Sequence, residues 1–102
     1  MKDLTPFMDL LLEADPKATK FKGAGGDSYT VWTPYSPDKT MSDNEQEDFT
    51  WHIQVDRFTK IDNDPIAEEI YNKLTEAGIP FEYNIDFEED TGYIHHIYDC
   101  LY

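Results

Sequence analysis

The sequence predicts an α+β fold: one domain over residues 1–102, with two helices packed on a mostly antiparallel sheet of four to five strands, in the order α-β-β-α-β-β. Three observations lead to this prediction. A chain of 102 residues has the usual size of a single domain. Two segments repeat apolar residues at helical spacing. Four further segments are rich in aromatic and β-branched residues or alternate apolar with polar ones, as half-buried strands do.

The first helix is expected to begin with Thr5 as its cap and to end before Pro16. Apolar residues recur between these two positions as they would on one face of a helix. The next expected element is a strand over residues 28–35, where tyrosine, valine and tryptophan are frequent. Pro34 is expected to end it, because proline cannot donate to a strand ladder.

Residues 36–48 contain almost no apolar side chain and are predicted to form a long acidic loop. Loops of this length in small domains are usually functional or disordered. Residues 49–59 then alternate regularly, with Ile53 on an apolar side and Gln54 on a polar side. We therefore expect a strand that is covered on one face only.

The second helix is predicted to begin at an Asp64 cap and to end at Gly78, which suits a left-handed terminator. Two strands should follow, over residues 81–87 and 93–102. The segment between them, 88–92, has the acidic and glycine-containing composition of a hairpin turn. The last four elements are thus strand, helix, strand and strand.

The charge balance limits the classes of partner. The chain has 22 acidic residues against 8 Lys and Arg, a formal charge of −14. Such a surface repels nucleic-acid phosphates and anionic membranes, so we expect no sequence-specific nucleic-acid binding and no membrane contact. No apolar run approaches the roughly 20 residues of a spanning helix, and the N-terminus lacks the basic leader of a signal peptide. The lone cysteine, Cys100, is expected to be a buried, inert thiol.

No pattern in the sequence indicates catalysis. His95 and His96 are adjacent on an expected strand and must face opposite sides. His52, His95 and Asp56 could meet on paired strands and hold a metal, but no zinc-type spacing is present. The acidic run at 88–90 lacks the alternating ligands of a calcium loop. We therefore predict no catalytic residue, no cofactor and no metal.

Three strings in the second half of the chain resemble a known family. Residues 49–60 read Phe-Thr-Trp-His-Ile-Gln-Val-Asp-Arg-Phe-Thr-Lys. Residues 66–81 contain the second expected helix, which ends in Ala-Gly, followed by an apolar residue and Phe. Residues 87–97 contain an acidic Asp-Thr-Gly turn before a histidine. In this order they are similar to the tail terminator (tail completion, head–tail joining) proteins of long-tailed, siphovirus-type phages and prophages. The likeness covers about residues 47–102, and the first half shares only the order of elements. His96, where lysine is commoner, and the acidic loop depart from the family pattern.

The resemblance implies a structural virion protein that is not an enzyme. Terminators of this family assemble as a ring, typically a hexamer, on the last ring of the tail tube. They stop tail polymerisation and present the surface that joins the head connector. The expected partners are accordingly copies of the same chain, the tail tube protein and the head connector or stopper. The expected location is the virion tail, assembled in the cytoplasm of a bacterial host.

We expect the contacts between subunits and with partners to lie in the acidic loop and on the polar side of the 49–59 strand. The tyrosines and tryptophans that a small domain cannot bury would add to them. The predicted contact residues are, in the loop, Met41, Asp43, Glu45 and Asp48, on the polar side of the strand, His52, Gln54 and Asp56, and in addition Arg57.

Two other classes of function are compatible with the composition. An acidic decoy would mimic DNA with spaced carboxylates and inhibit a host nuclease, which mixing the protein with restriction or CRISPR nucleases would reveal. A metal-dependent hydrolase built on His52, His95 and nearby acids would bind zinc or manganese tightly, which metal analysis of the chelator-free protein would reveal.

Overall fold

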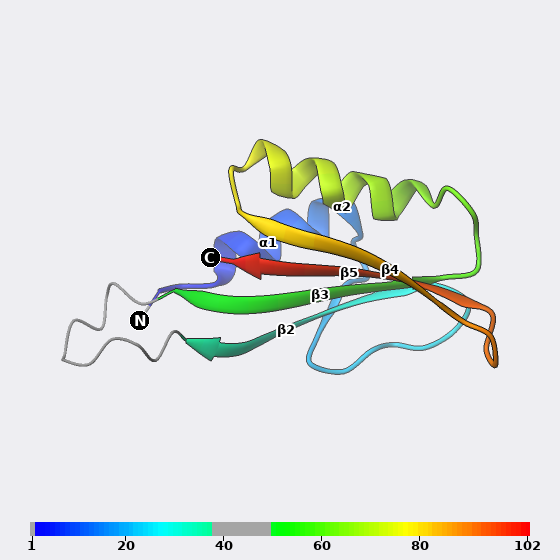
Figure 1. The fold of residues 1–102 in the computed structure, drawn as a ribbon. Coiled ribbons are helices and arrows are strands. Elements are labelled where there is room, and N and C mark those ends of the chain that lie inside the picture. Colours follow the sequence, from blue (N-terminus) through cyan, green and yellow to red (C-terminus); the bar gives the residue numbers. More distant parts are fainter. Residues whose placement is uncertain (1, 38–49) are drawn as a thin grey trace.

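The computed structural model describes residues 2–37 and 50–102. Within these ranges two helices lie on one face of a five-stranded sheet, which confirms the predicted α+β fold (Figure 1). The helices are α1 (Thr5–Ala14) and α2 (Pro65–Glu76), and the strands are β1 (Thr19–Lys20), β2 (Tyr29–Pro37), β3 (Trp51–Thr59), β4 (Phe81–Glu88) and β5 (Tyr93–Leu101).

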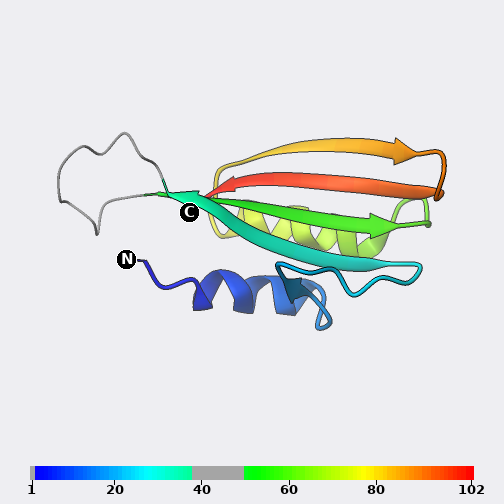
Figure 2. The same cartoon turned by 90° about the horizontal axis from the view of Figure 1, so that it is seen from below.

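The strands follow the order β1-β2-β3-β5-β4 across the sheet. All neighbours are antiparallel except β1, which pairs in parallel with β2 through only two residues. Among the elements of the described residues, this short strand is the one that the sequence did not predict. Figure 2 shows α2 behind the middle of the sheet and α1 near β1 and β2, while β4 forms the opposite edge. The two edges of the sheet are therefore β1 and β4.

The register places one row of side chains toward the helices. Trp32 pairs with Val55, Val55 with Tyr98, and Tyr98 with Tyr83. Because strand side chains alternate between faces, their neighbours in sequence point to the other face, which no helix of the described ranges covers. The sheet thus has one helix-covered face and one open face.

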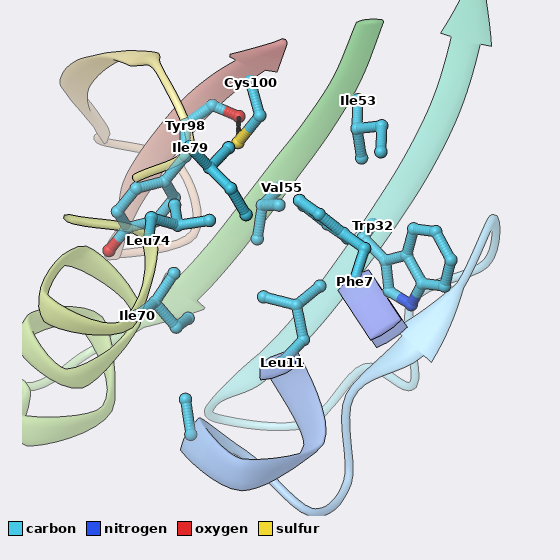
Figure 3. Packing of buried hydrophobic residues seen from close by; sticks show 11 residues of the cluster. Phe7, Leu11, Trp32, Ile53, Val55, Ile70, Leu74, Ile79, Tyr98 and Cys100 are labelled. Atoms are coloured by element: carbon cyan, nitrogen blue, oxygen red, sulfur yellow. Dashed lines mark hydrogen bonds between the residues drawn. The ribbon is translucent and has the colours of Figure 1, made fainter. Parts of the chain in front are cut away.

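The core fills the space between the helices and the middle strands (Figure 3). Leu11 of α1 and Ile70 of α2 are completely buried against Val55 of β3. The hydroxyl of buried Tyr98 donates to the carbonyl of Ala67 in α2 (2.6 Å), which satisfies its polar end. Cys100, as predicted, is buried, and this burial raises the pKa of its thiol to about 12.

Two predicted element boundaries were wrong. Thr5 is the first residue of α1 and does not cap it; Asp3 instead accepts hydrogen bonds from the Thr5 amide and hydroxyl (3.0 and 2.9 Å). Strand β2 continues past Pro34 to Pro37, because a register shift between Pro34 and Ser36 absorbs the missing donor. The predicted strand 49–59 begins, in the described part, at Trp51.

The α2 boundaries agree with the sequence. The Asp64 side chain accepts hydrogen bonds from the amides of Ile66 and Ala67 (3.4 and 3.3 Å), so it caps the helix as expected. Gly78 has a φ of +72°, the left-handed conformation that ends helices at glycine. Ala67, Ile70 and Leu74 form the buried face of α2.

Arg57 joins both helices to the sheet. Its Nε donates to Asp64 at the start of α2 (2.7 Å), and its Nη1 donates to Asp15 at the end of α1 (3.3 Å) and to Thr30 of β2 (3.3 Å). The side chains of Arg57, Asp15 and Asp64 are 4%, 7% and 2% exposed. One cation thus neutralises two buried carboxylates and fixes where the two helix ends lie on the sheet.

We expect the substitution Arg57→Met to lower the free energy of unfolding by about 3–5 kcal/mol, because it leaves two buried carboxylates without a counter-charge. Urea denaturation followed by circular dichroism measures the effect. The matched control is Lys60→Met: Lys60 and Asp27 form a surface pair at 3.8 Å with side chains 45% and 93% exposed, so stability should hardly change. A loss below about 1 kcal/mol for Arg57→Met would contradict this account.

Candidate functional site

A cleft opens on the helix side of the sheet, where β4 projects beyond α2. It has a volume of about 540 Å³. Its apolar walls come from the segment after β3 (Ile61), from α2 (Tyr71), and from β4 (Ile85). We call it the β4 cleft; the complete lining is Ile61, Asp62, Asn63, Asp64, Ala67, Glu68, Tyr71, Tyr83, Ile85, Ile94 and His96.

The cleft exists because α2 covers the start of β4 and leaves its far end exposed. Phe81, at the start of the strand, is half-buried and packs edge-on against Tyr71 of α2 (centroids 5.0 Å apart). Further along, Ile85 and Phe87 point to the same side but are 58% and 59% exposed. A row of apolar side chains therefore passes from the core to the surface along a sheet edge, and such surfaces typically mark interaction sites.

A histidine–tyrosine pair lies at the floor of the cleft. His96 Nδ1 and the Tyr83 hydroxyl are 2.7 Å apart, and the two rings stack with centroids 6.0 Å apart. Burial lowers the pKa of His96; the charge of Asp64 opposes this effect, while Arg57 and His95 reinforce it. Burial also raises the pKa of Tyr83. Near neutral pH the floor is therefore uncharged, which suits a hydroxyl that donates to an unprotonated imidazole nitrogen.

The open face of the sheet carries three of the predicted contact residues. Asp56 accepts hydrogen bonds from Gln54 (2.9 and 3.2 Å) and lies 2.7 Å from His95 Nε2. His52 lies further along β3, opposite Leu101, and its ring packs beside Tyr35 (centroids 5.8 Å apart). Gln54 and His52 are half-exposed, whereas Asp56 is only 9% exposed.

The other predicted contact residues are either buried or outside the described part of the chain. Arg57 belongs to the other face, where it is buried in its ion pairs with the helix ends, so its guanidinium is not available to a partner in this structure. Side chains alternate along a strand, so Arg57, two residues after Val55, lies on the same apolar side of β3. The other predicted contacts, Met41, Asp43, Glu45 and Asp48, lie outside the described residues, as does most of the acidic loop predicted at 36–48.

The structure does not bring His52, His95 and Asp56 together as a metal site on the open face. His95 stacks on Phe58 (centroids 4.1 Å apart) and lies between Asp56 and Glu88, with Nδ1 to Glu88 at 3.9 Å. His52 does not join them. Across residues 2–37 and 50–102, no group of three or more His, Cys, Asp or Glu side chains is arranged to hold a metal ion.

Sequence reasoning missed the cleft and the exposed aromatic residues around it. Residues 81–87 show a clear alternation, which predicted the strand but not that it lies at an edge. The expectation that a small domain cannot bury all of its tyrosines did not say which of them are exposed; in β5, Tyr98 is completely buried and Tyr93 is half-buried. The most exposed aromatic side chains with described burial are instead Phe21, Tyr35, Tyr71, Tyr83 and Phe87.

No protein-family model, curated protein or solved structure matches this chain. In the part of the chain that the structure describes, neither helix has the length and apolarity needed to cross a membrane.

We expect the stability of the protein to fall as the pH is lowered below 6.5, the ordinary pKa of histidine. His96 has a lowered pKa in the folded state, so between its two pKa values the unfolded chain binds a proton that the folded chain does not. The free energy of unfolding therefore decreases with decreasing pH in that window. Urea denaturation at a series of pH values down to about 5, before most carboxylates titrate, measures it.

The variant His96→Asn should show a smaller slope of stability against pH over the same range. His52→Asn, which removes a histidine from the same sheet but leaves His96 in place, is the matched control and should keep the slope. Equal slopes for the two variants would show that His96 is not the group responsible.

Proposed function

We propose that this chain is a structural subunit of a long-tailed phage that caps the end of the tail tube as a ring, stops tail polymerisation and forms the head–tail joining surface. The observation that carries the proposal is the β4 edge, a free sheet edge bordered by exposed Ile85 and Phe87 and by the β4 cleft. This edge, together with the three segments in residues 49–97 that resemble tail terminators, supports a function that depends on contacts between chains.

The physical requirements of a terminator match this arrangement. A subunit of a closed ring contacts its neighbours through two different surfaces, because head-to-tail contacts are heterologous. The sheet provides two unlike edges, the short β1 and the long β4, and two unlike faces, one packed on helices and one open. The two edges can therefore contact neighbouring subunits in a ring, while the two faces stay available to bind the tail tube and the head connector.

Deleting the gene from its phage and imaging the particles tests the function. We expect full heads beside unjoined or overlong tails, because nothing would halt the tube or join it to the connector. Supplying the gene in trans should restore normal virions. Normal virions from the deletion phage would overturn the proposal.

We expect the isolated protein to be mostly monomeric in dilute, low-salt buffer and to associate as salt or protein concentration rises. Each subunit carries a formal charge of −14, so neighbouring copies repel one another. The repulsion extends over about 30 Å at 0.01 M salt but only about 8 Å at physiological ionic strength. Sedimentation velocity over a salt series measures the change. A stable ring at low salt and micromolar concentration would be the opposite result.

A further inference from the structure

The charges of this acidic protein are separated between the two edges of its sheet. At the β1 edge, residues 17–22 contain three lysines and no acid, and all three lysines are exposed. At the β4 edge, residues 81–90 contain five acids and no base. Asp62 and Glu68 add negative charge at the rim of the β4 cleft. We call these two regions the basic edge and the acidic edge.

The basic edge also presents an aromatic side chain in an unusual conformation. Phe21 is 64% exposed, and its φ of +71° places a bulky residue in the left-handed region. The turn around it is held by three hydrogen bonds: Phe21 N to Trp32 O (2.9 Å), Lys22 N to Lys20 O (2.8 Å) and Thr19 Oγ1 to Lys22 O (2.7 Å). Strained backbone that surroundings hold in place often belongs to a functional surface.

The acidic edge provides a matching recess. The β4 cleft is lined by the apolar side chains of Ile61, Tyr71 and Ile85, which are 54%, 43% and 58% exposed. Its volume of about 540 Å³ can accept an aromatic ring. The acidic rim of this pocket comes from Asp62 and Glu68, because the even-numbered acids of β4 point to the open face of the sheet. An apolar pocket with such a rim fits an aromatic residue flanked by lysines, which is the composition of residues 20–22.

The two edges cannot meet within one chain. They lie at opposite ends of the strand order, and four strand spacings of about 4.8 Å put them about 19 Å apart. Two acidic edges cannot readily meet each other either, because the carboxylates of two β4 strands would face one another. A basic edge from another copy removes both obstacles.

We propose that the basic edge of one copy docks on the acidic edge of the next, with Phe21 inserted into the β4 cleft and Lys20 and Lys22 facing its acidic rim. This contact is head-to-tail, so it generates a ring if it closes and a filament if it does not. The expectation that the copies close into a ring rests on the proposed function. The hydrogen bonds that hold the turn around Phe21 favour binding, because less backbone freedom is lost when the ring is buried.

Two single substitutions separate the halves of this contact. Phe21→Asn removes the ring and keeps the left-handed backbone comfortable. Ile85→Lys places a charge on an exposed edge strand, where lysine is well tolerated. Matched controls are Tyr35→Asn and Leu101→Lys, at residues that are also exposed but belong to neither edge. Circular dichroism and urea denaturation verify that all four variants fold.

Sedimentation velocity near physiological salt tests the pairing. We expect the wild type and both controls to associate with increasing concentration, and each edge variant alone to associate roughly thirtyfold more weakly, as for loss of a buried aromatic anchor. An equimolar mixture of the two edge variants should form a two-subunit species with wild-type affinity that grows no further. Each mixed pair has one intact contact, formed by the cleft of Phe21→Asn and the Phe21 of Ile85→Lys.

Three results would overturn the inference: an edge variant that associates as the wild type does, a mixture that stays monomeric while the wild type associates, or a wild type that never associates. The phage deletion separates this failure from that of the proposed function. Suppose that the deletion blocks head–tail joining, and that the Ile85→Lys variant self-associates normally but does not restore joining when supplied to the deletion phage. In that case the proposed function holds, and the cleft binds a different basic protein and not a second copy.

Discussion

Two short helices have to cover a sheet of five strands in the described part of this chain, and most features of the molecule follow from that mismatch. Together α1 and α2 bury the helix-side face of the middle strands, where the side chains of Val55 and Tyr98 are inaccessible. Nothing in the described ranges covers the far end of β4, so its apolar row reaches solvent at Ile85 and Phe87. A free edge with an apolar border is costly for a solitary protein and useful for one that works in an assembly.

The position of the helices depends in turn on Arg57, the single arginine of the sequence. It pairs with Asp64 at the start of α2 and with Asp15 at the end of α1. The same buried cation therefore fixes the position of the first turn of α2, which borders the β4 cleft. Asp64 meanwhile caps α2 and lines the cleft. Burying three charges has a large desolvation cost, so losing one partner destabilises the fold even where the complete cluster adds little net stability.

The sequence predicted the parts of the fold that local patterns determine. The Asp64 cap, the Gly78 terminator and the alternation in residues 81–87 each depend on neighbours along the chain, and each prediction was confirmed. Strand order and side-chain pairing depend on contacts distant in sequence. Pattern alone therefore did not show that β4 is an edge, that a two-residue β1 exists, or that Arg57 is buried between Asp15 and Asp64. The candidate site was missed for this reason, since it combines residues from four separate segments.

The central claim is that the β4 edge is where another chain docks. Hydrogen–deuterium exchange tests it most directly, by comparing the amides of Phe81–Glu88 in the dilute monomer with those in the protein that has associated at high concentration. Amides on the outer side of an edge strand lack partners in the monomer and exchange quickly. We expect their exchange to slow markedly on association, while the exchange of the central strand β3, whose amides already pair with β2 and β5, changes little. Unchanged exchange along β4 in the associated protein would contradict it.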